Sequence, residues 1–427
     1  MDFIKEAVRQ NPHWQTGKIS FPRASGPLVK RNAFSQLKAS GKKKFITVLR
    51  GLRRTGKSVL ARQLVEDSIQ SGAKVQEFGF FEFERTMNAK PEDLDALLRF
   101  FISRGVKTVI LDEVPFVAGW QDVLKRHYDL SDQKFIVTGS SALELDRRSS
   151  ESLAGRFDTI QVRPFSFDEW LRLAGRPYGN SELEDAQKAE VLGLDCNEYL
   201  HRGGLPEVCG EPDEDTRNKY VRESLISSLL YKDVPAVFPG ANPDLLGKTL
   251  ELLAATVGST YQLQTLGQVL GCTHPTAGTQ VEVLERALLV RTALNRTPSI
   301  IKQRRTAKRI VFTDNGVLKT LRPETPVGFL AENACASALD ATLFWRDAQG
   351  REIDVLLPGE KLAVEVKYQE HVSSEDEKNL RYFLERNPGW RGVIATKNDE
   401  DSSDILRLPV WKLLLKGKGA LSGKGTR

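Results

Sequence analysis

The hydrophobic positions of the chain follow different periods in different parts. Three nearly continuous apolar runs occur in the first half, at 45–49, 106–114 and 134–141. Segments with helical spacing follow the first run and separate the other two, at 58–70 and 120–129. Strands buried on both faces read as continuous apolar runs, and parallel strands need crossover connections. The pattern therefore predicts an α/β domain whose parallel sheet is covered by helices on both faces.

After residue 180 the spacing becomes helical, and it changes again further along. Helices are predicted at 262–271 and 275–290 around a short turn, and two strand-like runs that flank a basic turn follow them. This order is the outline of a winged helix. We predict six segments: a loosely organised lead-in (1–43), an α/β core (44–180), a helical segment (181–257), a winged helix (258–325), a C-terminal α/β domain (326–411) and a disordered basic tail (412–427).

Composition narrows the class of protein. The 427 residues exceed what one core ordinarily holds, roughly 200 residues, so two or three domains are expected. A net charge of +6 and a pI near 9.0 permit binding to nucleic acid. The four scattered cysteines support neither a zinc ribbon nor a disulfide framework. Because we find neither a signal-peptide pattern nor an apolar run of roughly 18 residues, we expect a cytoplasmic protein without a membrane partner.

The stretch 51–58, GLRRTGKS, fits the pattern G-x-x-x-x-G-K-S/T and lies between a predicted strand and a predicted helix. Its glycines let the backbone approach phosphate oxygens closely, and the helix N-terminus attracts the anion. Lys57 is expected to reach the β- and γ-phosphates of ATP, and Ser58 to ligate Mg²⁺. The sequence therefore predicts an ATP site.

Acidic and hydroxyl residues end the next two apolar runs. VILDEV contains Asp112, expected to hold Mg²⁺, and Glu113, the candidate general base for the attacking water. The following run ends in TGSS, where Ser140 is the first candidate for contacting the γ-phosphate or the water, and Thr138 the second. A helix cap is the alternative role there. We assign nucleotide binding to Gly51, Arg54, Thr55, Gly56, Lys57, Ser58 and Asp112.

The stretch 351–368, REIDVLLPGEKLAVEVKY, is predicted to be a β-hairpin with a Pro-Gly turn. A four-residue loop places Asp354 opposite Glu365, and like charges across a strand pair are destabilising. A divalent cation between them, or a retained proton, makes the pair tolerable. The alternative is a purely structural hairpin in which Lys367 pairs with Glu352.

Taken together, the motifs resemble those of prokaryotic AAA+-type ATPases in which a winged helix and a domain related to PD-(D/E)XK nucleases follow the motor. The resemblance rests on GLRRTGKS, ILDEV, TGSS, LAGR, RPFSFDEW, YLHRGGLPEV, IVFTDNGVL, EIDVLL and LAVEVKY. It implies that 181–257 is a helical lid and that Arg156 is an arginine finger acting in trans. It also implies a Mg²⁺ or Mn²⁺ site at Glu332, Asp354 and Glu365, with Lys367 orienting water.

Polar and basic residues of the predicted winged helix are the candidates for binding DNA. They lie near the start of the second helix and in the turn between the two strands, and they are Thr276, Gln280, Lys302, Arg304, Arg305, Lys308 and Arg309. A cluster of cations suits a phosphate backbone and predicts salt-sensitive binding of low sequence specificity. Winged helices also serve as protein-docking modules, which is the alternative.

These inferences together describe a Mg²⁺-dependent ATPase that binds and remodels branched or duplex DNA. The C-terminal domain would bind or cut DNA, although Glu352-Ile353 stands where many nuclease relatives have proline before the aspartate. We expect a homo-oligomer, with a hexamer as one candidate form. The rival hypothesis is a switch ATPase that regulates a protein partner.

Overall fold

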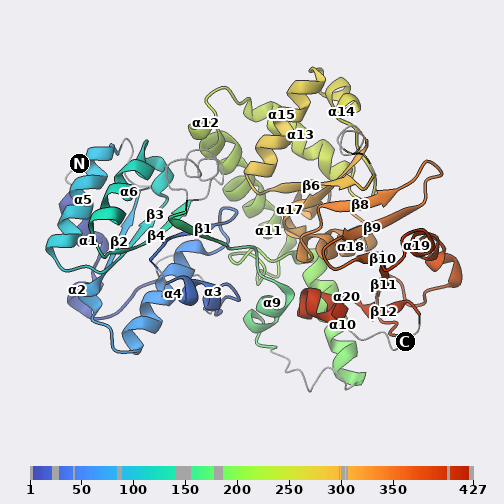
Figure 1. Ribbon diagram of the computed structural model, residues 1–427, viewed down its shortest axis with the longest axis horizontal. Coiled ribbons are helices and arrows are strands. Elements are labelled where there is room, and N and C mark those ends of the chain that lie inside the picture. The colour runs from blue at the N-terminus through green and yellow to red at the C-terminus, as the bar shows by residue number, and fades with distance from the viewer. Residues whose placement is uncertain are drawn as a thin grey trace. The chain divides into compact units, whose positions relative to one another are not determined.

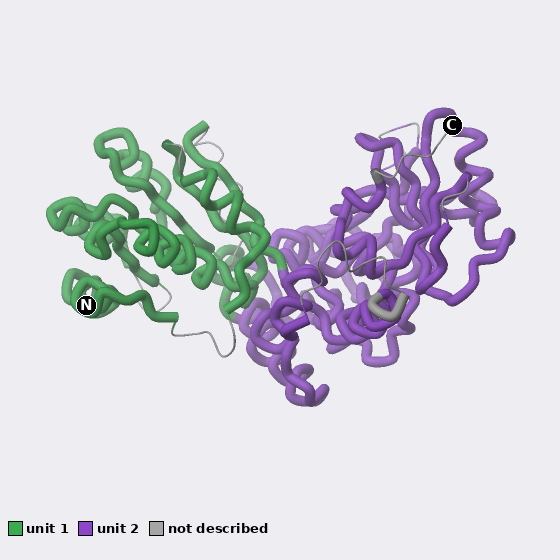
Figure 2. Tube along the Cα trace, turned by 90° about the horizontal axis from the view of Figure 1, so that it is seen from below, with its two compact units in different colours: residues 1–163, 232–239 green, residues 164–231, 240–427 purple. Residues whose placement is uncertain are grey.

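The computed structural model describes residues 3–21, 28–41, 44–83, 89–139, 155–176, 186–297, 299, 303, 306–401 and 404–422. The chain forms two compact units, which Figure 2 distinguishes by colour. The first consists of Met1–Arg163 and Lys232–Pro239, and the second of Pro164–Tyr231 and Gly240–Arg427. Each unit has its own central sheet (Figure 1).

The sheet of the first unit has five parallel strands in the order β2-β3-β4-β1-β5. They are β1 (Ile46–Arg50), β2 (Phe78–Glu82), β3 (Thr108–Asp112), β4 (Lys134–Gly139) and β5 (Phe157–Gln161). The three apolar runs of the sequence are β1, β3 and β4, which confirms the predicted parallel sheet. Its interior strands are buried on both faces, which explains why they show no polar alternation.

Helices of the first unit connect these strands, and apolar side chains gather on both sides of the sheet. The helices are α1 (Phe3–Gln10), α2 (His13–Thr16), α3 (Phe34–Ser40), α4 (Lys57–Gln70), α5 (Pro91–Ser103), α6 (Trp120–Leu130) and α12 (Val234–Val237). Short 3-10 turns lie at Val75–Glu77 and Val114–Phe116. The predicted helices 58–70 and 120–129 correspond to α4 and α6.

The N-terminal lead-in is not loosely organised, which corrects the prediction for its described residues. The side-chain amide of Asn11 pairs with both backbone groups of Phe80, at 2.7 Å to the carbonyl and 2.6 Å from the amide. The indole nitrogen of Trp14 donates to the carbonyl of Phe78 at 2.8 Å. Strand β2 lies at the edge of the sheet, so its backbone groups need partners. Polar side chains of the lead-in supply them.

The sheet of the second unit has seven strands in the order β12-β11-β10-β9-β8-β6-β7. They are β6 (Val290–Asn295), β7 (Lys308–Phe312), β8 (Leu343–Arg346), β9 (Glu352–Leu357), β10 (Leu362–Lys367), β11 (Arg391–Thr396) and β12 (Leu406–Pro409). Strand β6 pairs antiparallel with β7 and parallel with β8. The hairpin of the predicted winged helix therefore shares one sheet with the strands of the predicted C-terminal domain.

Helices of the second unit precede this sheet along the chain, connect its strands and follow its last strand (Figure 1). They are α9 (Phe167–Leu173), α10 (Ala186–Arg202), α11 (Glu214–Tyr220), α13 (Pro243–Ala255), α14 (Leu263–Leu270), α15 (His274–Arg286), α17 (Asn315–Leu321), α18 (Val327–Ala338), α19 (Ser374–Arg386) and α20 (Val410–Lys416). Two π-helical segments, Val221–Ser227 and Leu229–Asp233, follow α11, and the second crosses into the first unit.

Two predictions about the second unit need correction. The helix predicted at 275–290 ends at Arg286, because the backbone turns at Leu288 with φ of 60° and β6 begins at Val290. The tail predicted to be disordered is ordered as far as it is described. Its residues continue α20 and then form the 3-10 turn Gly417–Ser422, with Leu413 and Leu421 fully buried.

A corner built on Gly203 and Gly204 ties α10 to α17. The Asp314 carboxylate accepts hydrogen bonds from the amides of Gly204 at 2.7 Å and Gly316 at 2.8 Å. Gly203 has φ of +74°, and a Cβ there would lie 2.4 Å from both Asp314 Oδ1 and the Gly316 amide nitrogen. Glycine is required at this position because of both the backbone conformation and the contact.

The buried carboxyl group of Asp314 is expected to make the free energy of unfolding depend on pH. Burial raises its pKa from 3.8 to about 6, although the amides of Gly204 and Gly316 lower it. The proton binds the folded state more tightly than the unfolded state, so this contribution is complete below about pH 4 and is lost as the pH rises through about 6. We expect it to amount to roughly 2 kcal/mol. Unfolding free energies measured from pH 4 to 7 should fall less steeply for Asp314→Asn, and identical slopes would contradict the assignment.

Candidate functional site

The ends of three adjacent strands form the candidate ATP site of the first unit. Strands β3, β4 and β1 are neighbours and parallel, so their carboxyl ends meet at one edge of the sheet. The loop 51–56 leaves β1 at this edge, and α4 begins at Lys57. Asp112 ends β3, and Thr138 lies near the end of β4. Ligands bind at this edge of open α/β sheets.

The loop 51–56 is tightly packed, and backbone contacts and internal hydrogen bonds define its conformation. A Cβ on Gly51 would lie 2.1 Å from the Val162 carbonyl oxygen, so no larger residue fits. Gly56 has φ of +85°, and Arg54 adopts φ of 68°. The hydroxyl of the fully buried Thr55 donates to the Leu52 carbonyl at 2.8 Å. The predicted loop residues therefore form one compact turn at the N-terminus of α4, the geometry that suits a phosphate group.

Lys57 lies within this turn and is only 5% exposed. Its ammonium group donates to the carbonyls of Gly51 and Leu52, both at 3.1 Å. Burial lowers the pKa of Lys57, and the nearby carboxylates of Glu113 and Asp112 act in the opposite direction. The structure thus brings the predicted lysine and the two predicted acids into electrostatic contact.

Thr138 connects the two acids. Its hydroxyl donates a short hydrogen bond to Asp112 Oδ1 and accepts one from the Glu113 amide at 3.1 Å. Glu113 has φ of 54°, a conformation that costs energy for a residue other than glycine and that is common at functional sites. The sequence placed Thr138 second to Ser140, which lies outside the described residues. Within the described part of the chain, Thr138 is the hydroxyl that positions both acids.

Arg53, a residue of the loop that the sequence prediction left out, forms an ion pair with Asp233. Arg53 Nη1 lies 2.7 and 2.9 Å from the two carboxylate oxygens, and the side chains are 15% and 4% exposed. Asp233 also acts electrostatically on Lys57. The two partners are 180 residues apart, so no local pattern could have revealed the pair.

Arg156, the predicted arginine finger, begins the segment that leads into β5. Its guanidinium Nε lies 3.1 Å from Asp129 Oδ1, and the two side chains are 35% and 44% exposed. The Arg156 side chain is therefore partly exposed. Its role in trans remains a prediction.

A second cluster of charges lies in the second unit, around the predicted nuclease-like hairpin. The observed register pairs Leu357 with Leu362 and Val355 with Val364, which confirms the predicted hairpin. Asp354 Oδ2 accepts a hydrogen bond from the Val366 amide at 2.8 Å. The Lys367 ammonium lies 2.9 Å from Glu365 Oε1, so the alternative pairing of Lys367 with Glu352 is wrong.

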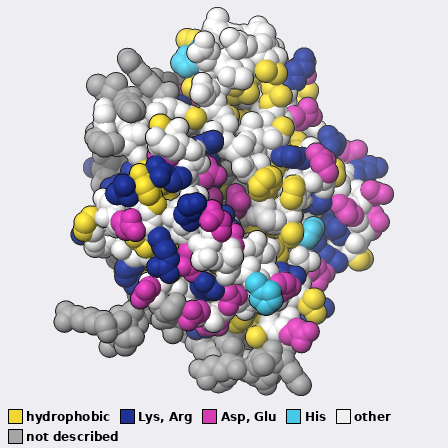
Figure 3. All heavy atoms as spheres, turned by 90° about the vertical axis from the view of Figure 1, so that its right-hand side faces the viewer, with side chains coloured by type: hydrophobic (Ala, Val, Ile, Leu, Met, Phe, Trp, Pro, Cys, Tyr) yellow, Lys and Arg dark blue, Asp and Glu magenta, His cyan; other side chains and the backbone are white. Residues whose placement is uncertain are grey.

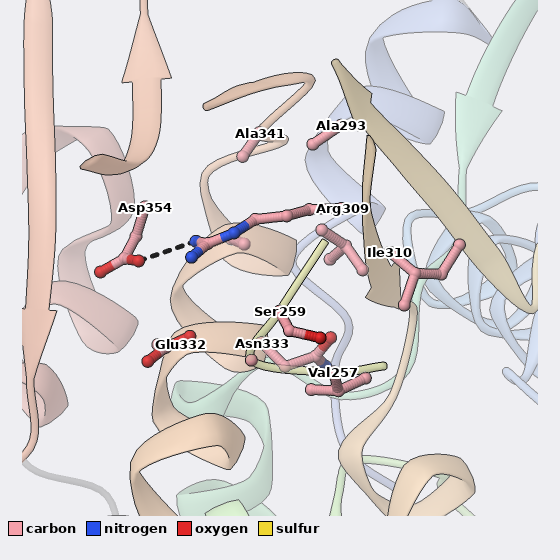
Figure 4. A pocket seen from close by; sticks show the side chains of 12 residues that line it. Val257, Ser259, Ala293, Arg309, Ile310, Glu332, Asn333, Ala341 and Asp354 are labelled. Carbon is pink, nitrogen blue, oxygen red and sulfur yellow. Dashed lines mark hydrogen bonds and ion pairs between the residues drawn. The ribbon is translucent and has the colours of Figure 1, made fainter. Parts of the chain in front are cut away.

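Arg309 of β7 occupies this cluster (Figure 4). Its Nη1 lies 2.7 Å from Asp354 Oδ1 and its Nη2 lies 2.6 Å from Glu352 Oε1. Glu332 of α18 lines the same pocket as Arg309 and Asp354. Burial raises the pKa of Glu332 and of Glu365, and the charge of Asp354 adds to both shifts.

The predicted Mg²⁺ or Mn²⁺ site at Glu332, Asp354 and Glu365 does not fit this arrangement. A divalent cation needs several oxygens within about 2.5 Å, and Arg309 already engages Asp354. Across the described ranges, no group of three or more His, Cys, Asp or Glu side chains is arranged to hold a metal ion. Both carboxylate oxygens of Asp354 are already engaged, Oδ1 by Arg309 and Oδ2 by the Val366 amide.

The four described residues among those predicted to bind DNA differ in their exposure. Thr276 is partly exposed in the first turn of α15, whereas Gln280 is 7% exposed and faces the interior. Burial lowers the pKa of Lys308, whose backbone pairs with Tyr261. Arg309 is engaged by carboxylates, which removes it and Gln280 as surface contacts. Lys302, Arg304 and Arg305 lie outside the described residues.

Charged side chains of both signs lie on the face that carries α19 and the neighbouring strands (Figure 3). Figure 3 shows Lys, Arg, Asp and Glu side chains intermixed over this face. Arg381 and Arg407, for example, both pair with Glu377. Among the described residues drawn there, cations do not gather into one continuous field.

In the described part of the chain, no helix has the length and apolar character needed to cross a lipid bilayer.

Models of protein families match three successive parts of the chain. An AAA domain matches 43–171, a domain of unknown function (DUF8612) matches 193–327, and another (DUF4143) matches 327–413. The first match contains the loop 51–58, Asp112, Glu113 and Thr138. Most of the segment that is similar to an AAA domain therefore lies in the first unit.

Curated relatives resemble the chain over different lengths. Uncharacterized protein MJ1544 of Methanocaldococcus jannaschii is 29% identical over 44% of this chain and 42% of its own length. MJ1637 of the same organism is 25% identical over 87% of this chain and 84% of its own length. A Haemophilus influenzae protein is 27% identical over 50% of this chain and 52% of its own length. The match thus spans about half or less of two of these relatives.

Solved structures overlap the chain only loosely. The Aeropyrum pernix Orc1 protein in complex with DNA aligns with a TM-score of 0.33 and 13% identity, covering 70% of this chain and 94% of that chain. Cdc6p from Pyrobaculum aerophilum aligns with a TM-score of 0.29 and 13% identity, covering 71% and 97%. At these scores the alignments do not establish a shared overall fold.

Proposed function

From the similarity of the first unit to an AAA domain, we propose that the chain hydrolyses ATP with Mg²⁺ and couples turnover to the binding of DNA. One observation carries the first part of this proposal. The phosphate-binding loop, Asp112 and Glu113 lie at one edge of the sheet, with Thr138 connecting the two acids. This is the set of groups that phosphoryl transfer to water requires.

Each residue has a distinct role in this proposal. The loop amides and Lys57 bind the phosphates, and Ser58 and Asp112 would hold Mg²⁺, since hydroxyl and carboxylate oxygens are suitable ligands. Bound Mg²⁺ neutralises charge on the phosphates. Glu113 accepts the proton of the attacking water. Thr138 is a positioning residue, because it holds the Asp112 carboxylate and the backbone of Glu113.

We infer that Asp233 competes with nucleotide phosphate for Arg53 and Lys57. Its carboxylate pairs with Arg53 at 2.7 Å and attracts Lys57. The negative charge of Asp233 would therefore repel the negative charge of a bound polyphosphate. Asp233→Asn is therefore expected to tighten ATP binding by roughly three- to tenfold, the equivalent of about 1 kcal/mol. Equilibrium titration with a fluorescent ATP analogue measures this affinity.

The matched control for Asp233→Asn is Asp95→Asn, which breaks the ion pair with Arg99 on α5 of the first unit. This control should leave ATP affinity unchanged. If Asp233→Asn left the affinity unchanged or weakened it, Asp233 would instead support the loop, and competition with phosphate would be rejected.

DNA is the proposed partner because of the order of elements in the second unit and the net charge of the chain. Helices α14 and α15 followed by the β6-β7 hairpin have the order of a winged helix, and the chain carries a net charge of +6. Thr276 in the first turn of α15 is placed to contact a phosphate. Branched or duplex DNA would be remodelled by an oligomer, with Arg156 acting on the ATP of a neighbouring copy.

The test compares ATP turnover with and without duplex and branched DNA. Particle mass is measured in parallel with a slowly hydrolysed ATP analogue, for the wild type and for Arg156→Ala. We expect DNA to raise the turnover, the analogue to favour an oligomer, and Arg156→Ala to lower turnover with ATP binding retained. A monomer whose slow hydrolysis ignores DNA would instead support a switch ATPase that regulates a protein partner.

A further inference from the structure

We propose that Arg309 takes the place of a divalent metal in the carboxylate cluster of the second unit. The cluster is thereby an internal ion-pair network that joins β7 to β9, and a metal can enter it only when the Arg309 side chain is removed. This inference concerns the second unit alone and does not depend on the proposed ATPase activity.

Neighbouring residues of the sheet determine the direction of the Arg309 side chain. On β6 the residue opposite Arg309 is Ala293, whose small side chain leaves room in the pocket that both residues line. The guanidinium group then lies 5.3 Å from the ring centre of Phe344 on β8. Figure 4 shows the side chain extended toward Asp354. With 8% of its surface exposed, Arg309 is fixed by packing as well as by charge.

The two ends of the guanidinium fork engage two different carboxylates. Nη1 lies 2.7 Å from Asp354 Oδ1 and Nη2 lies 2.6 Å from Glu352 Oε1. Two charge-assisted hydrogen bonds in one plane fix both orientation and distance. Burial opposes the charge of Arg309, but the carboxylates of Asp354 and Glu352 raise its pKa, so the group remains a cation. It supplies the positive charge that the opposed acids need.

The remaining oxygens show where a metal would bind in the absence of Arg309. Asp354 Oδ2 is already held by the Val366 amide, which fixes the carboxylate in the cluster. Glu365 is 2% exposed, and its Oε2 is buried without a hydrogen-bond partner among the described residues. Glu332 faces the same pocket from α18. Glu332 and Asp354 therefore line the pocket that the guanidinium enters, and Glu365 on the neighbouring strand β10 feels the charge of Asp354.

The consequence is a specific difference between the wild type and variants of Arg309. In the wild type the cluster rejects a divalent cation, because a second positive charge would meet Arg309 inside a buried site. An uncharged side chain at this position removes that repulsion and leaves Asp354 without the cation that it pairs with, whereas Glu365 keeps its ion pair with Lys367. Buried like charges then favour a cation strongly.

The experiment measures Mn²⁺ binding to the full chain without nucleotide, by calorimetry and by the shift of the unfolding temperature. The variants are Arg309→Met, which keeps an unbranched side chain but removes the charge, and Arg309→Lys, which keeps the charge. We expect no binding at this cluster in the wild type or in Arg309→Lys. Arg309→Met should bind one additional Mn²⁺ at least about tenfold more tightly and gain thermal stability from it, and Arg309→Met combined with Asp354→Asn should lose both effects.

Two outcomes would overturn the proposal. One is Mn²⁺ binding by the wild type that Asp354→Asn abolishes, because the cluster would then hold a metal despite Arg309. The other is a folded Arg309→Met variant that binds no more Mn²⁺ than the wild type. The first comparison needs no variant of Arg309, so it decides the question even if Arg309→Met fails to fold. Neither measurement involves ATP, so a failure here is distinct from a failure of the ATPase proposal.

Discussion

Glu113→Gln is expected to lower ATP turnover by roughly a hundredfold or more while ATP binding is retained. The substitution keeps the size of the side chain and removes its ability to accept a proton. Glu113 follows β3 directly, and its backbone is held by Thr138 with φ of 54°. That conformation places an acid beside the one that would hold Mg²⁺. Loss of the general base should therefore affect the chemical step and not the affinity.

Turnover is measured by phosphate release and binding by titration with a fluorescent ATP analogue. The matched control is Glu92→Gln, an exposed acid in the first turn of α5, which should change neither quantity. Lys57→Ala should instead weaken binding itself, because its ammonium group is part of the loop. Turnover of Glu113→Gln within about threefold of the wild type would exclude Glu113 as the general base.

Gly203→Ala is expected to destabilise the second unit by on the order of 3 kcal/mol or more. The added Cβ would lie 2.4 Å from Asp314 Oδ1 and from the Gly316 amide nitrogen, and 2.9 Å from the Gly316 Cα. Backbone atoms cannot move aside as a flexible side chain can. The substitution would therefore break the hydrogen bonds by which Asp314 holds α10 against α17.

Gly271→Ala is the control for the backbone conformation alone. Gly271 has φ of +66° at the end of α14, with no atom within 4 Å of an added Cβ. Its substitution should cost about 1 kcal/mol, the ordinary penalty for a left-handed residue. Chemical denaturation followed by tryptophan fluorescence compares the two variants. Equal losses would show that the conformation, and not the contact with Asp314, makes glycine necessary at 203.

Local patterns predicted most of the first unit and its ATP site. The runs 45–49, 106–114 and 134–141 became strands because burial on both faces requires continuous apolar sequence. Since the ends of parallel strands meet at one edge, the order of motifs also placed the loop 51–58 near Asp112 and Glu113. Strands β2 and β5 were not predicted.

For the hairpin of the second unit, local sequence patterns predicted the strand register but not the partners of its charged side chains. Its period of two and its Pro-Gly turn determined the register, which the structure confirms at Leu357 and Leu362. The same register raised the question of how Asp354 is tolerated near Glu365. A pattern within the hairpin could not answer it, because the counterion comes from Arg309, 45 residues away.

The sequence by itself determined many of the strands and helices, and which residues could bind phosphate, because both depend on spacing within a short stretch. Only the tertiary structure decided the partners of the buried charges. Asp233 pairs with Arg53 over 180 residues, Asp314 holds Gly204 over 110, and Arg309 closes a cluster that the sequence had assigned to a metal. A buried charge must find an opposite charge or a hydrogen bond wherever the fold supplies one, and that choice is made between elements that are distant along the chain.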